Sequence, residues 1–405
     1  MKKIRLCSLI LFWCLPSCLL AQSLILDASH KNLEDESLDL KQWAYFNSQL
    51  LADRRVWPQN DGRLTIESGL KEIDAGTFVL NVVINSIHKN ANLAIEVPVI
   101  FSSYQLFVNG QQVGSKGKVG LSVQTCVPEP RPDTYRFKST GDTIQLVLRV
   151  ANFYPSTGGI HGPVRLGLAS RVLLNNHFIK VMDYALAVVL LIIALVSLSF
   201  YYVRVEHRSV FIFQTLFSSA WLIRSLFSNY YRALDWLELS WKMQMRIEYL
   251  SVILTTVLAM FFIGSLFPQD FKKYVKTATL ILGSAFCISV LVLPPGVFIT
   301  YLWIYLAFSS LVLLNVLFLI MKAFLNNRGG STIMLITILL GSITFGYVII
   351  TYLGFYEINL MVYNVSFIIL WVMLAASVSV RLSKIDRLSE TSVLTMEHFF
   401  PGTHK

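Results

Sequence analysis

The chain has 405 residues, of which 55% are hydrophobic and only 14% are charged, so much of it needs apolar surroundings. Its formal net charge of +10 does not mark a basic domain, because the stretch 22–178 carries 15 Lys and Arg against 14 Asp and Glu. This composition excludes an ordinary soluble protein and leaves no basic face for a nucleic acid.

The N-terminus has the pattern of a secretory signal peptide over residues 1–21. Basic residues precede a short apolar run, Pro16 ends that run, and Ala21 offers a cleavage site. The run is too short to span a bilayer. The letters LPSC also resemble a lipoprotein box that ends at Cys18, so lipidation of this cysteine stays open.

Cysteine usage predicts neither a disulfide nor a metal centre. Beyond the leader the chain has only Cys126, in the exported part, and Cys287, in an apolar stretch. One exported cysteine cannot form an internal disulfide, and metal-ligand spacings such as CxxC do not occur. We therefore expect no metal and no other cofactor.

Residues 22–175 are predicted to form an all-β domain of the sandwich or jelly-roll type. Asn109 and Gly110 lie between two strand-like runs, and both tolerate the positive φ angles of a type I′ hairpin turn. Turn residues separate the strand-like runs, and no helical periodicity intervenes. The clearest runs are 77–84, 92–99, 104–117, 142–150 and 162–168.

Two stretches of this domain, SSYQLFVNGQQVGSKGKVG and VLRVANFYPSTGGIHGPVRLG, resemble the galactose-binding-like jelly roll of bacterial carbohydrate-active and sensory proteins. The resemblance implies a carbohydrate ligand. Aromatic and polar side chains near loops suit sugars, because rings stack on C–H faces. The alternative is that the tryptophans pack in the core and the histidine belongs to a turn. The candidate ligand residues are Trp43, Trp57, Phe153, Tyr154 and His161.

The sequence does not predict an enzyme. Glycoside hydrolysis needs two carboxylates that flank the scissile bond. Asp53, Glu96 and Glu129 are separate candidates, and no motif pairs any two of them.

Residues 176–380 are predicted to be an all-α membrane domain that crosses the lipid bilayer seven times. Each apolar stretch is close to the ~20 residues that a spanning helix needs. The expected spans are 179–203, 209–229, 246–267, 274–293, 298–323, 332–353 and 359–380.

Lys and Arg orient these spans, because cytoplasmic connections of membrane proteins are enriched in them. Placing the β domain outside a bacterial inner membrane agrees with the signal peptide and leaves the C-terminus in the cytoplasm. The external connections then contain Arg232, Lys242 and Arg246. The cytoplasmic ones contain Arg204, Arg208, Lys272, Lys273, Lys276, Lys322, Arg328, Arg381, Lys384 and Arg387.

Three ionisable residues are expected inside the spans at a similar depth, on the side of the β domain: Asp183, Arg224 and Glu248. Such groups are expensive in a bilayer and usually face one another or a wet cavity. They predict a polar coupling cluster beneath the β domain. The alternative is a static ion pair, with the acids reaching the interface.

The stretches YYVRVEHRSVFIFQTLFSSAWLIRSLF and MRIEYLSVILTTVLAMFFIGSLFPQDF resemble the bacterial seven-transmembrane receptors with diverse intracellular signalling modules. The resemblance covers leader, β domain and spans, and its most specific pieces are Arg246, Glu248, Tyr249 and the Leu-Phe-Pro that ends at Pro268. It implies sensing of an extracellular ligand and relay inward.

Residues 381–405 are expected to form a short cytoplasmic helical tail that continues the last span. This length holds no nucleotide-binding loop or phosphoacceptor motif, so the output would come from a separate cytoplasmic signalling protein or from a homo- or hetero-oligomer. A truncated gene is the third explanation. Two rival functions stay open: a transporter component, and a membrane-anchored carbohydrate-binding module without signalling.

Overall fold

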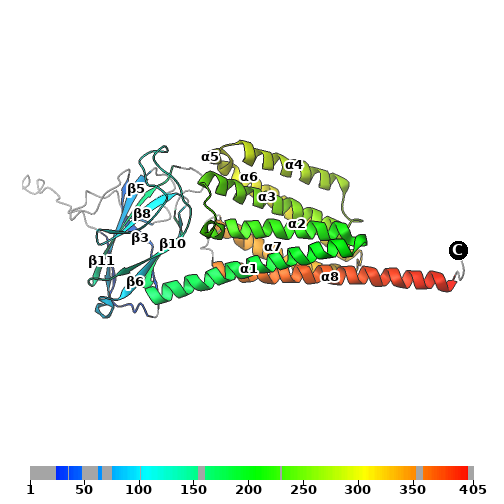
Figure 1. The fold of residues 1–405 in the computed structure, drawn as a ribbon, viewed down its shortest axis with the longest axis horizontal. Coiled ribbons are helices and arrows are strands. Elements are labelled where there is room, and N and C mark those ends of the chain that lie inside the picture. Colours follow the sequence, from blue (N-terminus) through cyan, green and yellow to red (C-terminus); the bar gives the residue numbers. More distant parts are fainter. Residues whose placement is uncertain are drawn as a thin grey trace, which may run out of the picture.

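The structure is a computed structural model that describes residues 24–34, 36–47, 63–65, 75–100, 102–153, 160–228, 230–352 and 359–399. The expected signal peptide lies outside these residues. Figure 1 shows a β domain at one end and a helical bundle beside it. We call the end of the bundle that faces the β domain its near end, and the opposite end its far end.

The β domain contains two facing sheets and a short two-stranded ribbon, as the alternating sequence pattern predicts (Figure 1). The ribbon pairs β12 (Ile160–His161) with β7 (Val99–Ile100). The smaller sheet has the order β10 (Asp133–Lys138), β6 (Asn92–Val97), β13 (Val164–Leu168) and β2 (Leu38–Leu40). The larger sheet has the order β4 (Arg63–Thr65), β3 (Gln42–Asn47), β5 (Ala75–Ile84), β11 (Thr143–Ala151), β8 (Ser103–Val108) and β9 (Gln111–Lys116), with β1 (Ile25–Ala28) parallel to β5.

Strand β6 shows how the smaller sheet separates a core face from an outer face. Its side chains alternate, so Leu93, Ile95 and Val97 enter the hydrophobic core between the sheets. Ala94 and Glu96 point the other way, toward the membrane bundle, and are buried there as well. The smaller sheet is therefore covered on both faces, and its outer face carries a buried carboxylate.

The predicted hairpin is confirmed at the turn between β8 and β9. Asn109 and Gly110 have φ angles of 48° and 81°, the left-handed values that a type I′ turn requires. The Asn109 side chain also accepts a hydrogen bond from the backbone N–H of Gln145 at 2.8 Å, which fastens the turn to β11.

The described part of the chain has seven helical segments that are long and apolar enough to cross a membrane, as the sequence predicts. A short 3-10 turn η2 (Val205–His207) precedes the second helix, and α5 (Pro295–Phe298) with η4 (Ile299–Tyr301) begins the fifth segment. The long helices are α1 (Ala169–Val203), α2 (Arg208–Phe227), α3 (Trp241–Leu266), α4 (Lys273–Val292), α6 (Leu302–Leu325), α7 (Ser331–Tyr352) and α8 (Leu360–Phe399).

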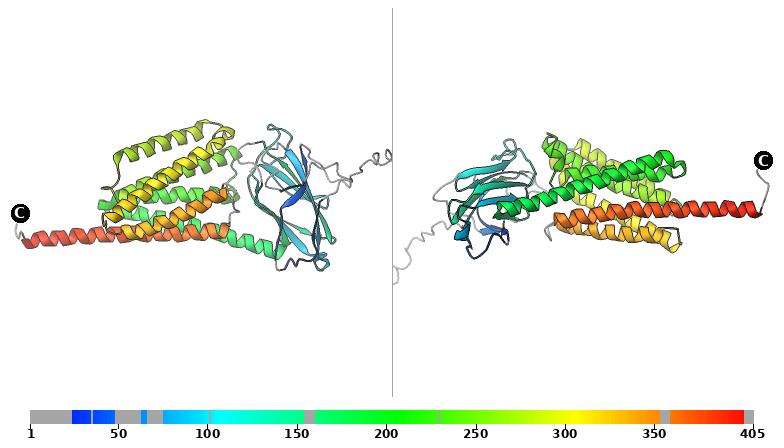
Figure 2. Two further views of the ribbon diagram at one scale, coloured as in Figure 1. Left: turned by 180° about the vertical axis from the view of Figure 1, so that it is seen from behind. Right: turned by 60° about the horizontal axis from the view of Figure 1, so that its bottom comes forward.

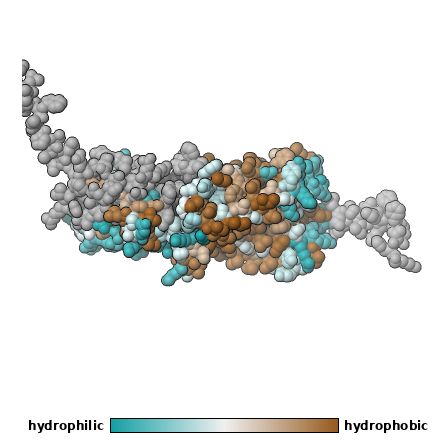
Figure 3. All heavy atoms as spheres, turned by 90° about the horizontal axis from the view of Figure 1, so that it is seen from above, coloured by the Kyte–Doolittle hydropathy of each residue, from teal (hydrophilic) through white to brown (hydrophobic). Residues whose placement is uncertain are grey.

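Apolar side chains cover the outside of the bundle, where a soluble protein would be polar. The space-filling view shows a broad hydrophobic surface over the helices, with hydrophilic residues toward the bundle ends (Figure 3). Residues such as Leu195, Leu314 and Ile343 are more than half exposed on this surface. Since a contiguous apolar surface of this size needs a nonaqueous partner, the lipid bilayer is that partner.

Two helices differ from the others in length and position. Helix α1 begins at Ala169, before the apolar stretch that starts at residue 179, and its first turns pack on the outer face of the smaller sheet (Figure 2). Helix α8 lies beside α1 and runs past the other helices at the far end (Figure 1). The last span therefore continues as one helix, as the sequence predicts.

Candidate functional site

The β domain meets the bundle at a polar interface formed by three parts. They are the outer face of the smaller sheet, the first turns of α1, and the connection between α2 and α3. We call this connection, residues 228 and 230–240, the junction segment. It contains a 3-10 turn, η3 (Arg232–Asp235).

The first turns of α1 are fixed to the smaller sheet by small residues and one hydrogen bond. Ala94 of β6 packs against Ala169 and Val172. A Cβ atom on Gly167 would lie 3.0 Å from Val172, so glycine lets the helix approach β13 closely. The Asn176 side chain donates to the Thr134 hydroxyl at 2.5 Å. The start of α1 is thus part of the β domain.

Tyr230 connects the junction segment to the β domain. Its hydroxyl donates to Oε1 of Glu96 at 3.1 Å. Burial raises the pKa of the Glu96 carboxyl above its ordinary value, against the opposing effects of Arg165 and the Tyr230 hydroxyl. Burial also raises the pKa of Tyr230, and the nearby Glu96 charge adds to that shift. The Tyr230 hydroxyl therefore remains a donor at neutral pH.

Tyr231 points into the bundle and contacts helix α3. Its hydroxyl donates to Oε2 of Glu248 at 3.1 Å, and its side chain is buried. The residue has a φ angle of 50°, a left-handed conformation that costs a non-glycine residue about 1–2 kcal/mol. That conformation lets two adjacent tyrosines reach partners in different domains.

Arg232 pairs with the acid of the first helix. Its Nε donates to Oδ2 of Asp183 at 2.8 Å, and both side chains are nearly buried. The other oxygen, Oδ1, accepts from the Asn364 amide of α8 at 2.6 Å. The Arg232 guanidinium also lies over the Tyr230 ring, 4.4 Å from its centre. One carboxylate thus joins α1, α8 and the junction segment.

Asp235 of the junction segment contacts both the β domain and α1. Its Oδ1 pairs with Arg131 of the β domain, and its Oδ2 lies 3.5 Å from Nζ of Lys180 on α1. Arg131 also donates to the Leu234 carbonyl at 3.4 Å. Asp235 lies in the same short turn as Arg232. Through Arg131 the β domain therefore contacts the turn that also holds Asp183.

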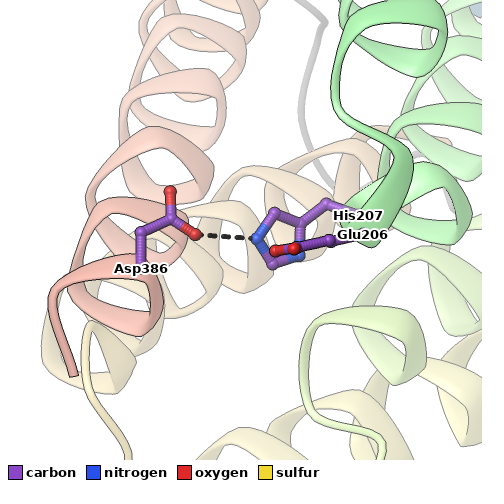
Figure 4. A group of neighbouring side chains, drawn as sticks. All are labelled: Glu206, His207 and Asp386. Atoms are coloured by element: carbon purple, nitrogen blue, oxygen red, sulfur yellow. Dashed lines mark hydrogen bonds and ion pairs between the residues drawn. The ribbon is translucent and has the colours of Figure 1, made fainter. Parts of the chain in front are cut away.

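At the far end, α8 is held to the corner between α1 and α2. Figure 4 shows Asp386 pointing at His207, and its Oδ1 lies 3.0 Å from Nε2 of that ring. Arg204 donates to Oδ2 of Asp386 at 2.8 Å. Glu206 adds a third potential metal-ligand atom, all three lying within 4.8 Å of one another. Since Arg204 already neutralises Asp386, this arrangement is an ion-pair contact that does not need a cation.

A second far-end contact joins α8 to the turn between α6 and α7. Arg381 donates to the Gly329 carbonyl at 2.5 Å and to the Leu266 carbonyl at 3.4 Å. Gly330 has a φ angle of 78°, and a Cβ there would lie 2.9 Å from the Arg381 backbone. The turn therefore needs glycine both for its conformation and for its approach to α8.

Of the three intramembrane residues predicted from the sequence, Glu248 and Arg224 lie close enough to interact electrostatically, and Asp183 has a different basic partner. Asp183 binds Arg232, which the sequence analysis assigned to an external connection, and Glu248 binds Tyr231. Arg224 stacks near Trp221, and its buried Nη1 has no hydrogen-bond partner among the described residues. The prediction missed the junction segment because its polar residues lie outside the apolar stretches.

Of the five predicted ligand residues, the side chains of Trp43 and Phe153 are described, and both pack against apolar neighbours. Trp43 has no exposed surface, and its indole N–H donates to the Leu40 carbonyl at 3.0 Å, so its ring packs in the core. Phe153 is partly buried beside Ala75, Cys126 and Ala151. His161 pairs through its backbone with Val99 of β7, and Trp57 and Tyr154 lie outside the described residues.

Comparison with known proteins gives limited likeness. No family model matches the chain, and no curated protein matches its sequence. A β-glucuronidase of Faecalibacterium prausnitzii is similar over 32% of this chain, with 12% identity and a TM-score of 0.25. A glycosyl hydrolase family 2 member from Bacteroides cellulosilyticus DSM 14838 is similar over 33%, with 13% identity and a TM-score of 0.25.

The chain covers 31% of the Faecalibacterium enzyme and 20% of the Bacteroides one. A Ruminococcus gnavus β-glucuronidase in complex with uronic deoxynojirimycin has a TM-score of 0.26 at 11% identity, over 33% of this chain and 29% of that enzyme.

The architecture itself defines the class of this chain: it is a multi-pass membrane protein with a β-sandwich domain joined to seven helices.

Proposed function

We propose that this protein is a membrane receptor-like sensor. Its β domain binds an extracytoplasmic ligand, and the bundle relays the bound state to α8, whose end presents it to a separate cytoplasmic signalling partner or to another receptor subunit. This function is the one implied by the resemblance to the bacterial seven-transmembrane receptors with diverse intracellular signalling modules.

One observation carries the proposal: three consecutive junction residues each contact a different part of the molecule. Tyr230 binds Glu96 of the β domain. Tyr231 binds Glu248 of α3, and Arg232 binds Asp183 of α1. A shift of the β domain against the bundle must therefore disturb the polar contacts of two helices.

The contact at Asp183 extends this connection to α8. Asn364 donates to the carboxylate that Arg232 also binds. Breaking a charged or polar contact in a low-dielectric setting costs much free energy. Such contacts therefore favour discrete arrangements of the helices over gradual bending. Because α8 is a single helix from Leu360 to Phe399, a change at Asn364 can be transmitted to the far-end contact of Asp386.

The charge distribution supports an orientation with the far end in the cytoplasm. Arg204, Arg328 and Arg381 all lie at far-end connections or on the far part of α8. The bacterial inner membrane remains the expected location. A carbohydrate remains a ligand class implied by the jelly-roll resemblance.

Hydrogen–deuterium exchange on the full-length protein in lipid nanodiscs tests the relay. Arg232→Gln removes the charge that binds Asp183, so amide exchange should increase along α8 as well as at the junction segment. Lys242→Gln is the matched control, because Lys242 is an exposed basic residue at the start of α3. Increased exchange confined to the junction segment would refute the relay.

Two experiments separate the rival functions from a receptor. If the protein is a membrane-anchored carbohydrate-binding module, Arg232→Gln should leave amide exchange along α8 unchanged. A transporter component predicts substrate-specific flux in vesicles that contain the purified protein. The described bundle offers a cavity of about 150 Å³ lined mainly by apolar side chains, which does not favour passage of a polar solute.

A further inference from the structure

A polar cavity of about 300 Å³ opens between the smaller sheet and the first turns of α1. This volume is at the lower end of the range of roughly 300–1,000 Å³ typical of small-molecule pockets. The cavity contains a residue of the relay, since Glu96 also accepts the hydrogen bond of Tyr230. Its lining consists of Ser37, Glu96, Arg165, Arg171, Val172 and Asn175.

The negative group of the cavity is buried. Glu96 is 6% exposed, and its Oε2 lies 3.8 Å from Nη1 of Arg165. Arg165 is shared with Asp39, to which its Nε donates at 3.2 Å. Arg165 and Tyr230 thus each contact one oxygen of Glu96. Because an ionised carboxylate has about four acceptor sites, Glu96 can accept a further charged donor.

The positive group lies on α1. Arg171 is exposed and donates to the backbone carbonyl of Glu34, and in the described part of the chain it forms no ion pair with a carboxylate. A guanidinium has five N–H donors, so Arg171 has donors left for a ligand beyond the one bound to the Glu34 carbonyl. One turn further along the helix, the Asn175 amide makes no hydrogen bond within the described residues and lines the same cavity.

We propose that this cavity binds a small zwitterion, a free amino acid. The ammonium group would lie at Glu96, and the carboxylate at Arg171 and Asn175. The cavity has one acid, Glu96, and two arginines, of which Arg165 already pairs with Glu96 and Asp39. Arg171 is therefore the basic group left for a ligand carboxylate, and charge-assisted hydrogen bonds are the strong ones. The six lining residues include no aromatic ring on which a sugar face could stack, which favours the amino acid over a neutral sugar.

This assignment deepens the proposed receptor function. The signalling effect of the amino acid depends on that function, whereas binding of the amino acid to the cavity does not. An ammonium group at Glu96 would bind the carboxylate that also accepts the Tyr230 hydrogen bond, and so would change the strength of that hydrogen bond. The ligand would therefore act on the first contact of the relay. A ligand shifts a conformational equilibrium only through different affinities for the two states, and this shared carboxylate provides such a difference.

Isothermal titration calorimetry on the full-length protein in nanodiscs tests the site. The probes are the standard protein amino acids, with acetate and ethylamine as analogues that carry one charge each, and glucose and galactose as neutral sugars. We expect at least one amino acid to bind, and neither the single-charge analogues nor the sugars to do so.

Glu96→Gln and Arg171→Gln should each weaken that binding by about tenfold or more, because each removes a charged partner. Arg136→Gln is the matched control, since Arg136 is exposed on β10 of the same sheet and is not among the lining residues. Because Arg171 is exposed, its variant is expected to fold even where the Glu96 variant does not.

Binding of a sugar in place of amino acids, failure of every amino acid to bind, or amino-acid binding that both variants leave intact would each overturn the assignment. Amino-acid binding at this site with no change along α8 would instead refute the relay and leave the site standing.

Discussion

Replacing Arg232 with glutamine tests how much the ion pair between Arg232 and Asp183 contributes to the stability of the bundle. The substitution keeps a polar side chain of similar reach and removes the charge that faces Asp183 at 2.8 Å. Their side chains are 12% and 9% exposed, so solvent screens the pair little. Removing one partner of such a pair leaves an uncompensated charge, which costs about 3–5 kcal/mol in buried settings.

Asn364 reduces that cost, because its amide still donates to Asp183. We therefore expect Arg232→Gln to destabilise the bundle by about 2–4 kcal/mol. Thermal unfolding in nanodiscs, followed by intrinsic tryptophan fluorescence, should show a transition several degrees lower than in the parent protein. Lys242→Gln is the control.

A double-mutant cycle isolates the pair. Asp183→Asn on its own removes the negative charge and leaves Arg232 without its partner, so it should also destabilise. The double variant Asp183→Asn/Arg232→Gln should recover part of the loss, with an interaction energy of about 1–3 kcal/mol. Strict additivity of the two single changes would show that the pair contributes nothing and would refute the reasoning.

Three further predictions concern the sheet, the helix packing and the far end. Because burial raises the pKa of Glu96 above its ordinary 4.5, the folded state holds this proton more tightly than the unfolded one, and stability should fall as pH rises above 4.5. In thermal scans across pH, Glu96→Gln should flatten that fall and Glu36→Gln should not. Gly167→Ala should cost about 1–3 kcal/mol in thermal unfolding, because the new Cβ would lie 3.0 Å from Val172, and an unchanged transition would argue against the close helix–sheet contact. Asp386→Asn should change stability by only about 0–1 kcal/mol, since its ion pair with Arg204 is substantially exposed. The same substitution should raise the mobility of a spin label at Ser383. An unaltered spectrum of that label would argue against the far-end contact.

Local chemistry made much of the fold predictable. Seven apolar stretches of spanning length became seven helical segments, because a bilayer allows the backbone few other solutions. The Asn109–Gly110 turn was predictable for a similar reason, since few residue pairs adopt its two positive φ angles. The alternation around Glu96 also follows from its strand, which buries Leu93, Ile95 and Val97 on the opposite face.

The polar contacts were less predictable, because they depend on how separate elements meet. Depth along the spans grouped Asp183 with Arg224, but the structure pairs Asp183 with Arg232 of a connection. A connection has no periodic pattern that reveals which of its residues turn toward the membrane. Trp43 illustrates a different limit, because sequence alone cannot distinguish an aromatic ring that fills a core from one that faces a ligand.

The central claim is that the β domain and the far end of α8 are coupled through the junction segment. Tyr230→Phe removes one hydroxyl, the one that binds Glu96, and Tyr135→Phe is the control, because that hydroxyl binds Tyr104 within the β domain. Spin labels at the exposed positions Glu206 and Ser383, on a background without native cysteines, report the distance between the α1–α2 corner and α8. The account predicts an altered distance distribution for Tyr230→Phe alone, whereas distributions identical to the parent in both variants would contradict it.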